Sequence, residues 1–216
     1  MAGTDDWTAA AREASDDDLR ERILTGFKTG KPFTPYRPTL ALPAGVERVL
    51  DFGCGVGRNF PYLKEVASHV TGFDLPPMIE RCRDLSPVPA DALSADWDDL
   101  RTRRFDLIVA TLVLQHIEPD RCREYLADFA RLAPAVYLLT RADSDFGTSV
   151  LQECAGTGLF DAGACVEVEH DESTHQLRVL GIRTFDDVRR EGRDGHYEVV
   201  LRSRQAAGPG RFRRRG

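Results

Sequence analysis

The chain has 216 residues, a length that fits one domain and leaves little room for a second. Its net charge of −6 argues against a broad nucleic-acid-binding surface, and no apolar run approaches the length that spans a membrane. The five cysteines form no C-x-x-C pair, and the N-terminus lacks the apolar core of a signal peptide. We therefore expect free thiols and a cytoplasmic protein without a membrane partner.

The first 40 residues are predicted to contain a helix followed by an extended segment. Residues 1–15 are polar apart from Trp7 and are expected to form a frayed, partly helical end. Asp16 is predicted to cap a short helix. Its apolar stripe consists of Leu19, Ile23, Leu24 and Phe27. The prolines within residues 32–38 exclude helix there, so we expect this stretch to be extended and to lead into the first strand.

Residues 46–74 combine a strand, a glycine-rich loop, a helix and a second strand. The apolar run at residues 49–52 is typical of a buried parallel strand, and a G-x-G-x-G loop follows at residues 53–57. The alternate glycines let the backbone turn sharply and leave no side chain between it and a ligand. The second strand ends on Asp74, about twenty residues past the loop, where α/β nucleotide sites hold the two ribose hydroxyls.

An acidic residue, Asp51, precedes this loop. Dinucleotide enzymes need a G-x-G-x-x-G spacing because a pyrophosphate must sit on the helix N-terminus, and an acid suits a pyrophosphate poorly. It suits a ligand that carries an amino group and a sulfonium. With Asp51, the loop and Asp74, residues 46–142 resemble the class I S-adenosylmethionine-dependent methyltransferases. An unrelated Rossmann-like strand–turn–helix is the alternative.

The resemblance implies a fold and a cofactor. The fold would be α/β, a three-layer Rossmann-like arrangement with a mostly parallel sheet and a C-terminal antiparallel hairpin, formed by residues 41–203. The cofactor would be S-adenosyl-L-methionine. Its methionine end would be held by Asp51 and the loop, and its ribose by Asp74. The loop residues concerned are Gly53, Cys54 and Gly55. The family also often has a lid before the loop, and Phe33, Tyr36 and Arg37 form either such a lid or a packed linker.

Two later stretches are implied to contact the adenine. The first contains Leu75 and Met78, and Met78 faces either the adenine or the core. The second is the acidic turn at Asp96 and Trp97. In the family, an acid at this place accepts a hydrogen bond from the adenine amino group, and an apolar neighbour covers the ring. Trp97 would then offer a flat face while its N–H stays in water. The alternative is a solvated acidic turn with an anchoring tryptophan.

Residues 105–117 contain the clearest buried strand and resemble the fourth strand of the family with the turn that follows it. Thr111 would lie near the methionine portion of the cofactor, and Gln115 and His116 near the transferred methyl group. His116 is the candidate general base because histidine titrates near neutrality. The alternative is a histidine that packs the strand end or shapes the pocket without accepting a proton.

The C-terminal part is predicted to complete the sheet. A fifth strand is expected at residues 136–140, and a helix broken by Gly156 and Gly158 within residues 145–160. Three further runs are expected to be strands, of which the first two read as a hairpin, although the family ends in one antiparallel pair. These runs are residues 165–169, 176–182 and 197–201. Residues 204–216 are predicted to be a disordered basic tail.

A polar loop tip separates the first two of these runs. It carries His170, Asp171 and His175, which are possible metal ligands by type. Their spacing fits no strong metal signature, so we expect a solvated turn and no metal site.

The predicted activity is transfer of a methyl group to an oxygen or nitrogen atom. Because little chain lies beyond the core, the acceptor is expected to be a small molecule. One alternative is a non-catalytic S-adenosylmethionine-binding subunit, or an enzyme that carries out other chemistry on this compound. A lesser alternative is a nicotinamide-dependent oxidoreductase, which the missing sixth-position glycine disfavours. The sequence leaves the oligomeric state open.

Overall fold

The computed structural model of the protein describes five segments of the chain, residues 4–19, 37–142, 150–171, 176–184 and 195–205. The predicted helical positions Ile23, Leu24 and Phe27 lie outside these segments. Most of the predicted C-terminal tail and part of the 170–175 loop do so as well.

The described strands form one mixed sheet of eight strands in the order β3-β2-β1-β4-β5-β8-β6-β7. Strands β1 to β5 run parallel, whereas β8 pairs antiparallel with both β5 and β6, and β7 pairs antiparallel with β6. All three C-terminal runs are therefore strands, and the additional one is β7 at the edge. The strands are β1 Arg48–Phe52, β2 His69–Phe73, β3 Ala92–Ser94, β4 Leu107–Thr111, β5 Ala135–Ala142, β6 Phe160–Asp171, β7 Gln176–Arg183 and β8 Gly195–Ser203.

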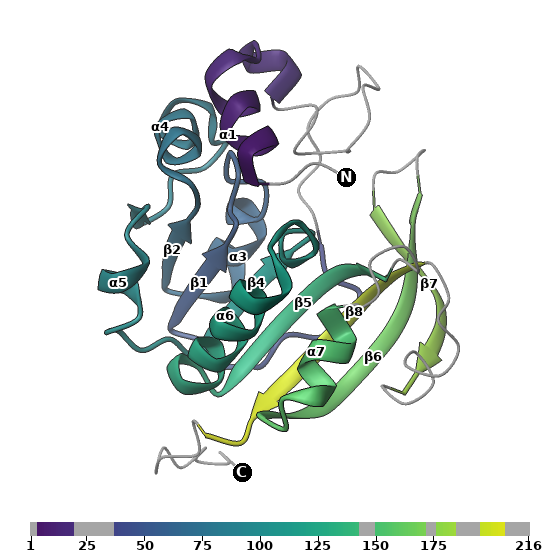
Figure 1. Cartoon of the computed structure of the whole chain (residues 1–216). Helices are drawn as coiled ribbons and strands as arrows, with labels where there is room; N and C mark the ends of the chain where they lie inside the picture. Colours follow the sequence, from purple (N-terminus) through teal and green to yellow (C-terminus); the bar gives the residue numbers. More distant parts are fainter. Residues whose placement is uncertain (1–3, 20–36, 143–149, 172–175, 185–194, 206–216) are drawn as a thin grey trace.

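Helices cover both faces of this sheet and complete three layers, as predicted (Figure 1). One face carries α3 and α4, and the other carries α5, α6 and α7. Among the described helices, none has both the length and the apolar character that crossing a membrane requires. The helices are α1 Thr4–Glu13, α3 Phe60–Val66, α4 Pro76–Leu85, α5 Trp97–Leu100, the 3-10 turn η1 Leu114–His116, α6 Pro119–Leu132 and α7 Val150–Gly156.

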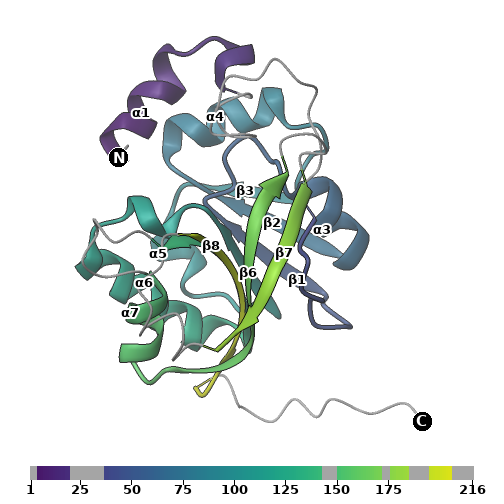
Figure 2. The same ribbon diagram turned by 90° about the vertical axis from the view of Figure 1, so that its right-hand side faces the viewer.

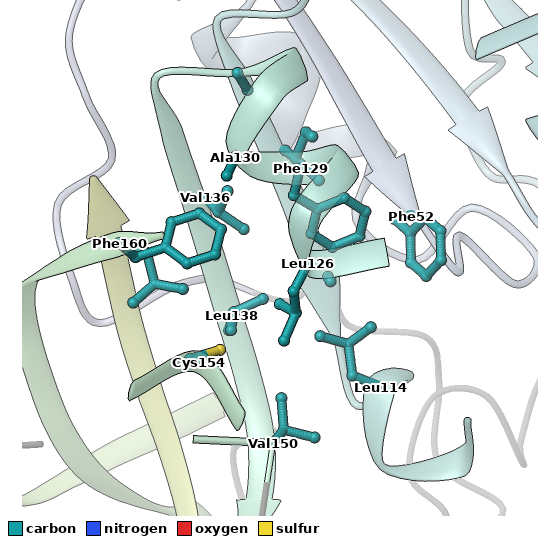
Figure 3. Close-up of a cluster of buried hydrophobic side chains, with 14 of the residues drawn as sticks. Phe52, Leu114, Leu126, Phe129, Ala130, Val136, Leu138, Val150, Cys154 and Phe160 are labelled. Carbon is teal, nitrogen blue, oxygen red and sulfur yellow. The ribbon is translucent and has the colours of Figure 1, made fainter. Parts of the chain in front are cut away.

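Neighbouring residues of one strand enter two different cores, because side chains alternate across a sheet. In β1, Val49 packs with α3 and α4, whereas Leu50 and Phe52 pack with α5, α6 and α7. Figure 3 shows the second core, where Leu126 and Phe129 of α6 lie between Phe52 and the strand β5. Asp51 therefore points toward the face that carries α3, and it does so in a wholly buried position.

The N-terminal residues form a packed helix rather than a frayed end. Helix α1 lies beside α4, beyond the arrowheads of β1 and β2, in both views (Figures 1 and 2). The next helical stretch begins at Asp16, but the cap is Ser15, whose Oγ accepts from the N–H of Asp18 at 3.2 Å. The cap therefore lies one residue earlier than predicted, since a side-chain oxygen before the first turn satisfies its free N–H groups.

The described part of the expected lid lies against α3. Arg37 pairs with Glu65 at 2.8 Å, and its guanidinium lies over the ring of Tyr62, 5.6 Å from the centroid. These contacts place Arg37 on the outer surface of α3. Phe33 and Tyr36 lie outside the described residues.

A buried carboxylate fixes the continuation of this linker. Glu198 of β8 is fully buried and accepts from the backbone N–H groups of Thr39 and Leu40 and from the hydroxyl of Tyr137. The Thr39 hydroxyl also donates to it. A buried carboxylate is stable only when its oxygens are hydrogen-bonded, and here one carboxylate ties the linker to two strands.

Candidate functional site

The glycine loop and the carboxyl ends of β1, β2 and β4 meet at one edge of the sheet, where open α/β sheets bind ligands. Gly53, Gly55 and Gly57 all adopt left-handed backbone angles, with φ of +74°, +55° and +83°. A Cβ atom on Gly53 would lie 2.4 Å from the side chain of Val113. The loop is therefore a tight turn that only glycine can form at these positions, as the spacing predicted.

Asp51 is the acid that precedes the loop. Its Oδ1 accepts a hydrogen bond from Asn59 Nδ2 at 3.0 Å, and the same amide donates to Thr111 Oγ1, also at 3.0 Å. Asn59 thus links the end of β1 to the end of β4. The structure brings Asp51 and Thr111 together, which the sequence resemblance implied, but through a residue that sequence reasoning treated only as the start of a helix.

Asp74 follows β2 and lies against the loop. Its Oδ2 accepts from the backbone N–H of Gly55 at 2.7 Å, and its Oδ1 accepts from the N–H of Leu75 at 2.7 Å. The N–H groups of Gly53 and Cys54 donate to the carbonyl of Phe73, so backbone bonds hold the loop to the same strand. Each carboxylate oxygen keeps a second acceptor site, which leaves Asp74 able to bind ligand hydroxyls.

The two acids make the site electronegative and poised to accept a cation. Burial raises the pKa of Asp51 from 3.8 to about 7, although the bond from Asn59 lowers it, and the charge of Asp74 adds to the rise. Burial likewise raises the pKa of Asp74 to about 6, against the two backbone bonds that lower it. The Oδ2 of Asp51 is buried and has no hydrogen-bond partner among the described residues. A primary ammonium group fits this oxygen because it supplies both charge and a donor.

Cys54 contributes its backbone to the loop. Its side chain is 2 % exposed, and burial, followed by a bond with Cys82, raises the pKa of the thiol. The thiol is therefore a packed, neutral group and not a nucleophile.

The start of α5 holds the two residues expected at the adenine. Asp96 is exposed, and its Oδ1 caps α5 by accepting from the N–H of Asp99 at 3.1 Å. Trp97 is only 6 % exposed, and its Nε1 donates to Asp128 at 2.9 Å. The expectation that the indole N–H stays in water is therefore wrong, because α6 supplies a carboxylate acceptor for it.

The ring of Trp97 is enclosed by an aromatic cluster. The ring centroids of its neighbours lie between 5.1 and 6.0 Å away. Such edge-to-face and tilted contacts stabilise a packed core. The ring is thus a structural support for the end of β2, which corrects the picture of an open face. The neighbours are Phe52, Phe73, Tyr125 and Phe129.

Met78 and Leu75 lie beside the glycine loop, in a small cluster of their own. Met78 is 2 % exposed and packs with Val56 of the loop and with the N-terminal segment, while Leu75 borders the cluster half-buried. The cluster's buried members are Ala11, Leu19, Val56, Met78 and Leu85.

The turn after β4 is held in an unusual conformation. Leu112 has a φ of +54°, which is strained for a residue with a branched side chain, and its N–H donates to the carbonyl of Leu139 at 2.7 Å. The following turn η1 brings His116, half-buried, to the same edge of the sheet. The hydroxyl of Thr140 donates to Oε1 of Gln115 at 3.4 Å.

A residue from the N-terminal helix completes this edge. The ring of Trp7 lies 5.7 Å from that of His116, in an edge-to-face arrangement. Sequence reasoning missed Trp7, Leu112 and Asn59 as parts of the site. Only Asn59 had a local signal, since it lies two residues after the glycine loop; the other two depend on contacts between distant segments.

A family model described as a methyltransferase domain matches residues 9–198. The N-methyltransferase NodS from Bradyrhizobium japonicum WM9, in complex with S-adenosyl-L-homocysteine, has 18 % identity and a TM-score of 0.50 over 74 % of this chain and 79 % of that chain. A structure from work on conversion of a disulfide bond into a thioacetal group during echinomycin biosynthesis has 19 % identity and a TM-score of 0.55 over 94 % and 93 %. At these identities the structural likeness shows the fold alone. No curated protein matches the sequence.

Proposed function

Since the chain belongs to the methyltransferase domain family and uses S-adenosylmethionine as its cofactor, we propose that it methylates an oxygen or nitrogen atom of a small molecule. The observation that carries the cofactor site is the buried Oδ2 of Asp51 beside the glycine loop, which has no hydrogen-bond partner among the described residues. It is the acceptor that an ammonium group requires, and a nicotinamide dinucleotide carries no ammonium group.

We assign each end of the cofactor to its own residues. Asp51 and the loop formed by Gly53, Cys54 and Gly55 would hold the methionine end, with Thr111 beside Asp51 through Asn59. Asp74 would accept from the ribose hydroxyls with the lone pairs that Gly55 and Leu75 leave open.

The adenine would lie between the ends of β2 and β3. Asp96 is the exposed acceptor there, and Leu75 and Met78 line the side toward α4. Trp97 would support this site from behind, through the cluster that includes Phe73.

The cofactor supplies an activated methyl group, so the protein needs chiefly to orient the acceptor and exclude water. We assign to His116 the removal of the acceptor proton. Its place in η1, half-buried at the ligand edge of the sheet and next to Trp7, supports this role.

Ligand binding tests the cofactor site. S-adenosylhomocysteine at a hundredfold excess over its dissociation constant should stabilise the fold by about 2.7 kcal/mol, seen as a rise in melting temperature. NADH at the same concentration is the matched control and should cause no rise. If S-adenosylhomocysteine leaves the melting temperature unchanged, the assigned cofactor site is wrong.

The acceptor itself is found by mass spectrometry. A metabolite pool incubated with the enzyme and methyl-labelled cofactor should contain a labelled small molecule that gains one methylene unit. Label that appears only on macromolecules would refute the small-molecule proposal and leave the cofactor site standing.

A further inference from the structure

Helix α1 brings one aromatic side chain over the ligand edge of the sheet. Trp7 packs against the cluster that contains Val56 of the glycine loop and Met78 of α4. On its other side its ring meets His116, which follows β4. Trp7 therefore contacts both the cluster at the glycine loop and the turn after β4, the two sides of the site proposed for the methionine end of the cofactor.

The polar atom of this side chain finds no partner in the part of the chain that the structure describes. The Nε1 of Trp7 is buried and has no hydrogen-bond acceptor among the described residues. A buried N–H without an acceptor is costly, and native proteins almost always supply one from the protein, from water or from a ligand. Because Trp7 lies at the ligand edge, a ligand is the natural source of that acceptor.

The cofactor carries a group that could accept a hydrogen bond from Trp7 Nε1. Its methionine end carries an ammonium group and a carboxylate. Asp51 suits the ammonium group, but its negative charge repels the carboxylate, which needs an N–H donor nearby. An indole N–H can only donate. We propose that the Nε1–H of Trp7 binds the carboxylate of S-adenosylmethionine, so that α1 is part of the cofactor site; this inference rests on the proposed function.

Arg81 of α4 holds α1 in the required position. Its guanidinium donates to the carbonyls of Ala11 and Ala14, each at 3.1 Å, and to the carboxylate of Asp16 at 2.7 Å. These three bonds hold the C-terminal end of α1 and the residues just after it, where carbonyls lack helical partners. Arg81 touches no ligand in this arrangement and is a positioning residue for Trp7.

The test compares two ligands that differ only in the carboxylate. Isothermal titration calorimetry would measure S-adenosylhomocysteine and its decarboxylated counterpart, S-adenosyl-3-thiopropylamine, with wild type and with Trp7→Phe. The phenylalanine keeps an aromatic ring and removes the donor. We expect Trp7→Phe to weaken S-adenosylhomocysteine about tenfold, or about 1.4 kcal/mol, and to change the amine less than about threefold.

A second variant keeps the proposal testable if Trp7→Phe does not fold. Arg81→Ala should cause the same carboxylate-selective loss, because it releases α1. Arg83→Ala, at an exposed position of the same helix, is the control and should cause none. An equal loss for both ligands, or no loss for either, would overturn the role of Trp7. If the wild-type protein does not bind S-adenosylhomocysteine, the proposed function itself is refuted, and the role of Trp7 that depends on it is refuted too.

Discussion

The carboxylate of Asp74 accepts a hydrogen bond from the backbone N–H of Gly55 at 2.7 Å. The residue that is proposed to hold the ribose therefore also holds the glycine loop, across 19 positions of sequence. The proposed ribose contact would therefore couple ligand affinity to loop geometry at this one side chain.

Replacing Asp74 by alanine should weaken S-adenosylhomocysteine by about 1.5–3 kcal/mol, because a charge-assisted acceptor is lost. Glu80→Ala removes the same charge from an exposed position of α4 and should leave the affinity unchanged. Titration calorimetry of both variants measures the difference. Wild-type affinity in Asp74→Ala would mean that another residue binds the ribose.

The raised pKa of Asp51 predicts that rising pH lowers the free energy of unfolding and raises the affinity for an ammonium-bearing ligand. Its pKa is about 7 in the fold against an ordinary value of 3.8, so the folded protein retains a proton that the unfolded chain releases. The free energy of unfolding should therefore fall as pH rises from about 4 to about 7. Affinity for an ammonium-bearing ligand should rise through the same upper range, since the ionised carboxylate is the binding form.

The variant Asp51→Asn separates these effects. It should raise the free energy of unfolding at pH 8 by roughly 2 kcal/mol, because no charge is buried, and it should lose most affinity for S-adenosylhomocysteine. Urea unfolding at pH 5 and pH 8, together with calorimetry, provides the measurements. Destabilisation at pH 8 combined with intact binding would contradict the assignment.

If His116 removes the acceptor proton, His116→Ala should lower turnover on the order of a hundredfold or more while cofactor affinity is kept. His69→Ala, exposed at the amino end of β2, is the matched histidine control. Single-turnover rates with labelled cofactor measure the effect. A fully active His116→Ala would reduce this residue to packing against Trp7.

Trp97→Phe should lower the free energy of unfolding by about 1–3 kcal/mol, because the Asp128 carboxylate loses its indole donor. Asp128→Ala removes the same bond and keeps the ring. Both variants should bind S-adenosylhomocysteine within about threefold of wild type if the ring only supports the adenine site. A tenfold loss confined to Trp97→Phe would show that the ring face contacts the adenine.

Features that depend on neighbouring residues were predictable from the sequence alone. The positive φ angles of Gly53 and Gly57 follow from the spacing of glycines, and the two acids follow from their places at the ends of apolar runs, Asp51 before the loop and Asp74 after the second strand. The predicted fold class is confirmed, since the pattern of apolar runs determines strands, crossover helices and a parallel sheet. Backbone sterics and hydrophobic periodicity are local, which is why one sequence suffices.

Tertiary structure alone decided the features that join distant segments. Trp97 and Asp128 meet because α5 and α6 pack on one face, and Trp7 reaches His116 because Arg81 clamps α1 to α4. The place of β8 between β5 and β6 is likewise a matter of long-range pairing. Such contacts depend on which surfaces bury each other, and that choice is made by the whole chain at once, not by any window of its sequence.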